Sequence, residues 1–179
     1  MYSHVVTPKK RIVMTYGSTQ ARPGWPVLVG IIAITVLAAA IGTVASLQAP
    51  EFYMMLDAPS WAPPPWLFGP VWTVLYAMMA LAAWLVVRER RRSSVVPEMT
   101  LYGAQLALNA LWTWLFFRWH QGAAAFAEIV VLLILVGLTT LAFGRIRSLA
   151  GALMLPYLAW VSFATGLTFS LWQRNPGLL

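Results

Sequence analysis

Residues 58–72 read APSWAPPPWLFGPVW, with five prolines and three tryptophans in fifteen positions. Proline fixes φ, donates no backbone hydrogen, and pushes the residue before it toward extended conformations. We therefore expect residues 58–65 to form a stiff, extended loop that holds Trp61 in one place, with Pro65 or Pro70 in the first turn of the next helix. Because residues 71–87 are almost entirely apolar, the loop should lead into a membrane helix and close a pocket.

The composition is that of an integral membrane protein. Of the 179 residues, 60% are hydrophobic and 9% are charged, whereas a soluble domain has about 25% charged residues. The chain has no cysteine, which excludes disulfides and thiolate metal sites. The net charge of +7 gathers at the ends of apolar runs, where membrane topology accounts for it. We therefore expect membrane lipid as a partner and no nucleic acid.

Five apolar runs predict an all-α membrane protein, because about twenty residues span the hydrocarbon layer. The runs cover about residues 26–47, 70–87, 99–117, 123–143 and 149–172. This pattern indicates a five-transmembrane-helix bundle with a long proline- and tryptophan-rich first loop over residues 48–69. Residues 1–25 have the composition of a basic, flexible tail, residues 26–175 form the membrane domain, and residues 176–179 form a short C-terminal tail.

The basic residues are distributed unevenly between the two sides that five spans would create. Ten of the twelve lie on the side of the N-terminus, and they are Lys9, Lys10, Arg11, Arg22, Arg88, Arg90, Arg91, Arg92, Arg145 and Arg147. The other side has only Arg118 and Arg174. The positive-inside rule then predicts a cytoplasmic N-terminus, with the first loop and the C-terminus on the opposite side.

Polar residues within the predicted spans are candidates for a site, because they are costly in a membrane. Gln105, Asn109, Trp112 and Phe116 follow one another at helical spacing and share one face of the third span. The amide of Asn109 would serve either as a polar contact between helices or as a contact in a ligand pocket. Glu128, near the start of the fourth span, is expected to be interfacial and solvated; the alternative is a buried pair with Arg118 or His120.

The fifth span carries an aromatic face. Pro156 lies inside it and should kink the helix. Tyr157, Trp160 and the small Ala164 lie on one face and would make a concave aromatic wall, although such a stripe is also compatible with packing alone. A lone histidine in a turn, His120, is weak support for a haem ligand. No metal-ligand spacing, nucleophile–base pair or phosphate loop is present, so no metal site is predicted.

Three blocks of sequence resemble the TspO/MBR family. They are PSWAPP at 59–64 with FGPVWT at 68–73, QLALN at 105–109 with Trp112, and PYLAW at 156–160 with ATGL at 164–167. The likeness extends from about Pro26 to Asn175. It implies a five-helix bundle, usually a homodimer, with a pocket under the first loop. It also implies tetrapyrrole ligands such as protoporphyrin IX and haem, and no obligatory cofactor.

The resemblance also assigns site residues by position. It implies ligand contacts at Tyr53, Trp61, Asn109, Trp112, Thr139, Trp160 and Ala164, to which the aromatic face adds Tyr157. Some family members are proposed to degrade porphyrin in light, and the matching tryptophans here are Trp61 and Trp160. The family's proposed sterol motif has a tyrosine where this chain has Phe169, so sterol recognition is not predicted.

Three functions follow from these observations. A membrane receptor or sensor for tetrapyrroles is the first. A transporter of porphyrins or other small amphiphiles is the second, although the chain has neither visible internal repeats nor paired intramembrane charges. A light-dependent porphyrin-degrading enzyme is the third.

Overall fold

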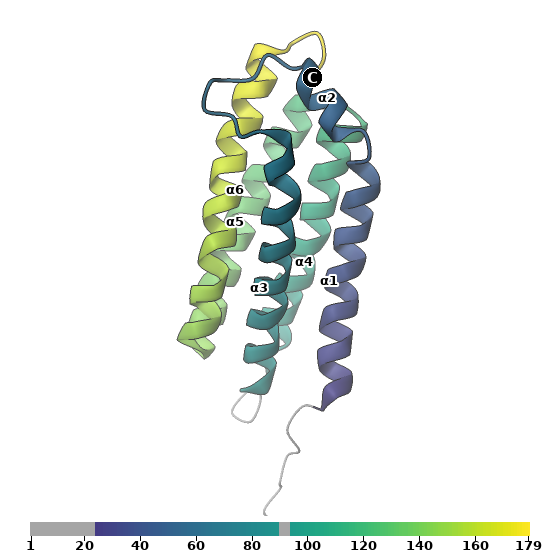
Figure 1. The fold of residues 1–179 in the computed structure, drawn as a ribbon. Coiled ribbons are helices and arrows are strands. Elements are labelled where there is room, and N and C mark those ends of the chain that lie inside the picture. Colours follow the sequence, from purple (N-terminus) through teal and green to yellow (C-terminus); the bar gives the residue numbers. More distant parts are fainter. Residues whose placement is uncertain (1–23, 90–93) are drawn as a thin grey trace, which may run out of the picture.

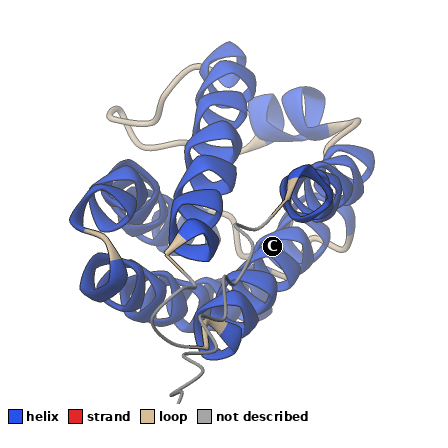
Figure 2. Cartoon of the chain, turned by 90° about the horizontal axis from the view of Figure 1, so that it is seen from below, coloured by secondary structure: helices blue, strands red, loops and turns tan. Residues whose placement is uncertain are grey.

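The computed structural model describes residues 24–89 and 94–179, and within these ranges all regular structure is helical. Five long helices stand side by side in one bundle (Figure 1), seen from one end in Figure 2. They are α1 (Trp25–Ala45), α3 (Phe68–Arg88), α4 (Val96–Thr113), α5 (Gly122–Ile146) and α6 (Ser148–Arg174). The shorter elements are α2 (Ala49–Met55), the 3₁₀ turn η1 (Pro65–Leu67) and the π-helix η2 (Trp114–Arg118). Most of the predicted basic tail over residues 1–25 lies outside the described chain.

The bundle has the character of a membrane protein. By length and composition, four segments of the described chain are able to cross a membrane: α1, α5, α6 and Pro65–Arg88, which includes α3. The fifth long helix, α4, is less apolar because it carries Glu98, Gln105 and Asn109, yet it packs against both α1 and α5. The predicted all-α membrane bundle is therefore confirmed, and one of its five long helices is markedly more polar than a typical span.

Basic residues are separated between the two ends of the bundle. Figure 1 places α2, the proline-rich loop and the C-terminus at one end, and the start of α1 at the other. Arg88, Arg145 and Arg147 lie at the end where α1 starts, whereas Arg118 and Arg174 lie at the loop end. This distribution of basic residues between the two ends agrees with five membrane spans. The cytoplasmic location of the N-terminus stays a prediction. The other seven basic residues of that prediction, within residues 1–23 and 90–92, are outside the described chain.

The first loop is more structured than predicted. The chain does not form one loop over residues 48–69 but forms α2 and η1, with non-helical residues 56–64 between them. Prolines lie in the first turns of both elements, where the missing amide hydrogen costs no helical hydrogen bond. Within the non-helical stretch, the Ala62 N–H donates to the Pro59 carbonyl at 2.9 Å, so Trp61 lies in a tight turn.

The C-terminal end of one predicted helix also differs in detail from the expectation. The helix predicted over residues 99–117 ends in the π-helix η2, which carries the buried Phe116. The chain then turns at His120, which has a φ of 53°, and the His120 ring stacks on Phe52 of α2 at a centroid distance of 4.0 Å. The fifth predicted span, α6, runs through Pro156 as one continuous helix, and the kink expected there stays a prediction. π-helical turns are frequent at functional sites, and Phe116 of η2 meets Phe52 of α2 edge-on at a centroid distance of 6.3 Å.

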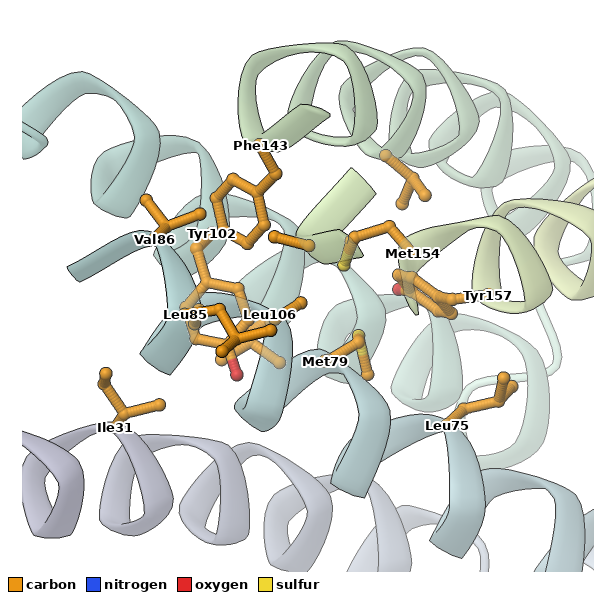
Figure 3. Close-up of a cluster of buried hydrophobic side chains, with 14 of the residues drawn as sticks. Ile31, Leu75, Met79, Leu85, Val86, Tyr102, Leu106, Phe143, Met154 and Tyr157 are labelled. Carbon is orange, nitrogen blue, oxygen red and sulfur yellow. The ribbon is translucent and has the colours of Figure 1, made fainter. Parts of the chain in front are cut away.

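The core draws side chains from all five long helices. Figure 3 shows part of it, with Ile31, Met79, Tyr102, Phe143 and Tyr157 contributed by α1, α3, α4, α5 and α6 respectively. Four of these side chains are at most 1% exposed. Many large apolar side chains elsewhere on the long helices are exposed, which is expected of a surface that faces lipid. The bundle is therefore packed by apolar contacts inside and presents apolar side chains outside.

A polar latch fastens the first loop to the C-terminal end of α6. The side-chain amide of Asn175 accepts a hydrogen bond from the Asp57 backbone N–H at 2.8 Å and donates to the Asp57 carbonyl at 3.3 Å. Asn175 also donates to the Leu171 carbonyl at 2.8 Å and is only 7% exposed. The Arg174 guanidinium lies 3.3 Å from the Asp57 carboxylate, although this ion pair is exposed and therefore weak. The buried amide is the stronger part of the latch.

Replacing Asn175 with alanine should loosen the first loop. The change leaves the Asp57 backbone groups without their side-chain partners, and a typical intramolecular hydrogen bond contributes about 0.5–1.5 kcal/mol. We expect the loop amides, including that of Ala62, to exchange hydrogen about tenfold faster or more, as measured by mass spectrometry on the purified protein. Gln173→Ala, an exposed neighbour on the same helix, is the matched control. Equal exchange in the two variants would show that the latch does not hold the loop.

Candidate functional site

A large cavity lies beneath α2 and the proline-rich loop. Its volume is about 1020 Å³, and it is bounded by α1, α2, η1, α3, α4, η2 and α6. Lining residues run along α1 from Leu28 to Ser46 and along α3 from Phe68 to Trp84, so the cavity extends far down these two helices. Ten lining side chains are aromatic, and they are Tyr53, Phe68, Trp72, Tyr76, Trp84, Trp112, Phe116, Phe117, Trp160 and Phe163. A concave, mostly apolar chamber of this size is typical of a small-molecule site.

Five of the eight predicted ligand contacts line this cavity. They are Tyr53 on α2, Asn109 and Trp112 on α4, and Trp160 and Ala164 on α6. Trp61, Thr139 and Tyr157 are not among the lining residues. The structure therefore brings together residues from three separate parts of the sequence, while ligand contact at each of them remains a prediction.

Trp61 does not cover the cavity directly. Its side chain is 51% exposed and packs edge-on against Phe163, with ring centroids 5.7 Å apart and an interplanar angle of 76°. Phe163 itself lines the cavity, so the indole reaches the cavity only through this neighbour. The residues that line the loop end of the cavity include Tyr53, Pro65 and Phe68. Ligand contact at Trp61 therefore has no support from the cavity lining and stays a prediction.

Tyr53 is fixed at this end by the loop itself. Its hydroxyl donates to the Pro63 carbonyl at 3.2 Å, and its ring meets Phe68 edge-on at 5.5 Å. Burial raises the pKa of the Tyr53 phenol, so the hydroxyl stays protonated and able to donate this hydrogen bond. The proline-rich loop therefore positions an aromatic wall through Tyr53 at the loop end of the cavity.

Asn109 joins three helices at the wall of the cavity. The Tyr76 hydroxyl of α3 donates to Asn109 Oδ1 at 2.6 Å, and Asn109 Nδ2 donates to the Tyr157 hydroxyl of α6 at 3.2 Å. Tyr76 lines the cavity, whereas Tyr157 is fully buried behind it. The geometry is therefore compatible with both predicted roles of Asn109, because its amide links helices and also faces the cavity. Sequence reasoning missed Tyr76 as a site residue, although it lies one helical turn after Trp72.

Thr139 and Glu128, both on α5, lie outside the cavity lining. Thr139 is buried, and its hydroxyl donates to the Leu135 carbonyl at 2.7 Å, one turn back in its own helix. Both Glu128 carboxylate oxygens are buried without a hydrogen-bond partner in the described chain. The expectation of a solvated Glu128 is therefore wrong, and so is the alternative of a pair with Arg118 or His120.

The cavity also has hydroxyl-bearing residues that the sequence did not single out. Within the described chain, five of them donate their hydroxyl hydrogen to a carbonyl one turn back in the same helix. They are Thr35, Thr43, Ser46, Thr73 and Thr113. Three of these lie on α1 or α3, and Ser46 caps the C-terminal end of α1. No pattern in α1 marked one face as a cavity wall, because that helix is apolar on all sides.

Comparison with known proteins agrees with this architecture. A sequence model of the TspO/MBR family matches residues 30–173. The chain is 41% identical to a tryptophan-rich protein TspO of Chlorobaculum tepidum. The match is 145 residues long and covers 78% of this chain and 92% of that relative. It is 40% identical to a tryptophan-rich sensory protein of Cereibacter sphaeroides, over 74% of this chain and 82% of the relative. It is 38% identical to the human translocator protein, over 71% of this chain and 76% of the relative.

The fold and the cavity define a multi-pass integral membrane protein of helical-bundle type, with an aromatic-lined chamber under its first loop. Within this class of membrane protein, the length and the sequence identity of the matches define the family. The chain belongs to the TspO/MBR family, as the sequence blocks around residues 59–73, 105–112 and 156–167 predicted.

Proposed function

We propose that this protein is a membrane receptor for tetrapyrroles, which binds protoporphyrin IX or haem in the cavity under the first loop and so regulates porphyrin-linked stress or signalling. The observation that carries the proposal is a chamber of about 1020 Å³ with ten aromatic side chains in its lining. A flat, apolar macrocycle buries its faces well against such walls, and aromatic pairs add about 0.5–1.5 kcal/mol each beyond the area they bury. Relatives named as tryptophan-rich sensory protein support a sensing role.

Within the cavity, Trp160 and Trp72 offer aromatic surfaces that are held by neighbouring rings. Trp160 meets Phe68 edge-on at 6.0 Å and Phe163 at 5.6 Å. Trp72 lies 5.6 Å from the ring of Tyr76, which in turn is held by Asn109. The macrocycle would therefore stack on walls that are already ordered, with the Asn109 amide as a neutral polar contact beside the ring.

Titration with protoporphyrin IX tests the proposal. We expect saturable quenching of tryptophan fluorescence in the full-length protein in detergent, and we expect Trp160→Ala to weaken binding about tenfold, because it removes one stacking wall. Trp119→Ala is the matched control, since Trp119 is half exposed and does not line the cavity. Equal affinity in the two variants, or equal quenching by the unfolded protein, would contradict the proposal.

Transport of a small amphiphile is the second candidate, favoured by one observation. The lining residues continue along α1 and α3 toward the end of the bundle opposite the loop, and four mammalian relatives bear the name translocator protein. Flux of protoporphyrin IX across proteoliposomes, compared with empty vesicles, separates transport from binding alone. Light-dependent degradation gains no such support, because Trp61 does not share the cavity surface with Trp160.

A further inference from the structure

The cavity lining is uncharged over its whole extent. Within the described chain, none of the residues that line it is Asp, Glu, Lys, Arg or His. The charged groups at the loop end of the bundle have other roles or lie outside the lining. Arg174 pairs with Asp57 at 3.3 Å, and the ring of His120 stacks on Phe52. A ligand inside the cavity therefore meets no ionised side chain.

The polar atoms of the lining are also largely committed to partners within the protein. The five hydroxyl-bearing residues described above donate to carbonyls of their own helices. Tyr53 donates to Pro63, and Tyr76 donates to Asn109. The donors that remain for a ligand are neutral: the second amide hydrogen of Asn109, the Thr168 hydroxyl and the indole N–H groups of the lining tryptophans. This set suits a neutral acceptor far better than a carboxylate.

Charge is the property on which such a cavity discriminates most strongly. Moving an ionised carboxylate out of water is unfavourable unless a cation and several hydrogen bonds compensate, and the lining supplies neither. We propose that the cavity accepts only the uncharged part of its ligand, so that a porphyrin enters by its macrocycle while its two carboxylates stay outside and add little to affinity. This inference rests on the proposed function. It specifies which part of the ligand the cavity binds, namely the uncharged ring.

The carboxylates of protoporphyrin IX make the claim testable, because both lie on one edge of the ring and can be esterified. We expect protoporphyrin IX and its dimethyl ester to bind the full-length protein with dissociation constants within about threefold of each other, or with the ester tighter. A loss of tenfold or more for the ester would overturn the inference and leave the proposed function intact. Absence of saturable binding by either compound would instead contradict the proposed function, and the inference with it.

A variant that adds a positive charge provides a second, independent test. Thr43 lines the cavity near the end of α1, and its neighbour Val44 is exposed and does not line the cavity. We expect Thr43→Lys to shift the preference toward the dicarboxylate by about tenfold relative to the ester, because the ammonium now offers a carboxylate an ionic partner at the wall. Val44→Lys, which adds the same charge outside the lining, should leave the ratio unchanged. The same ratio in both variants would contradict the inference that lining charge sets the ligand class.

Discussion

Replacing Gly151 with alanine should destabilise the bundle strongly, even though alanine is the better helix former by about 1 kcal/mol. A Cβ at this position would lie 2.7 Å from the Gly144 Cα, 3.1 Å from the Gly144 nitrogen and 3.2 Å from the Thr140 carbonyl oxygen. All three atoms belong to the backbone of α5, so no side chain can rotate out of the way. Overpacking typically costs about 1–3 kcal/mol and occasionally more, and here α5 and α6 must separate as rigid elements. We expect the upper part of that range or beyond.

Thermal unfolding of the detergent-solubilised protein measures this effect. Gly166→Ala is the matched control, because Gly166 lies on the same helix and a Cβ there would meet no atom within 4 Å. That variant should be neutral or slightly stabilised through helix propensity alone. A Gly151→Ala variant that unfolds at the same temperature as Gly166→Ala would show that the two helices are not in backbone contact at Gly144.

Much of the fold is predictable from the sequence because its limits are set by strong local signals. Prolines prevent helix over most of residues 58–64, and clusters of basic residues end the apolar runs, so the limits of the long helices agree with the structure within a few residues. The short α2 is less predictable. Seven residues that include Pro50 give little helical signal, and α2 is ordered by tertiary contacts such as the stacking of Phe52 on His120.

The site is predictable only where a polar or aromatic residue interrupts an apolar helix. Asn109 and Trp160 stand out in this way, and both line the cavity. α1 supplies much of the wall with no polar groups other than the Thr35 and Thr43 hydroxyls, which are satisfied within the helix, so its contribution is not visible in the sequence. Proline spacing fixes the backbone near Trp61 but not the direction of its side chain, which depends on the turn closed between Pro59 and Ala62.

The burial of Glu128 is not visible in the sequence either. The sequence places it near the start of a span, where an interfacial carboxylate is expected, yet both of its carboxylate oxygens are buried. Elsewhere at the start of α5, Gly122 packs closely against the side chains of Trp172 and Leu179, where an added Cβ would lie 2.7 and 2.8 Å from them. Contacts between residues fifty or more positions apart cannot be inferred from local spacing.

Filling the cavity at Ala164 should abolish most ligand binding while the fold survives. Ala164 lies on α6 in the cavity wall, one turn after Trp160, so Ala164→Trp places an indole in the space that a macrocycle would occupy. We expect protoporphyrin IX to bind at least about tenfold more weakly, equivalent to about 1.4 kcal/mol. Because the cavity is already empty of protein atoms at this wall, the new side chain displaces ligand and not core.

The control for this variant is Ala159→Trp, which adds the same side chain on the same helix at an exposed position outside the lining. It should bind protoporphyrin IX as the unmodified protein does, so that any loss in Ala164→Trp reports occupancy of the cavity and not a general effect of an added indole on α6. Fluorescence titration and thermal unfolding of both variants separate loss of binding from loss of fold. If Ala164→Trp keeps full affinity and a normal melting temperature, the tetrapyrrole binds elsewhere on the protein, and the aromatic chamber has another purpose.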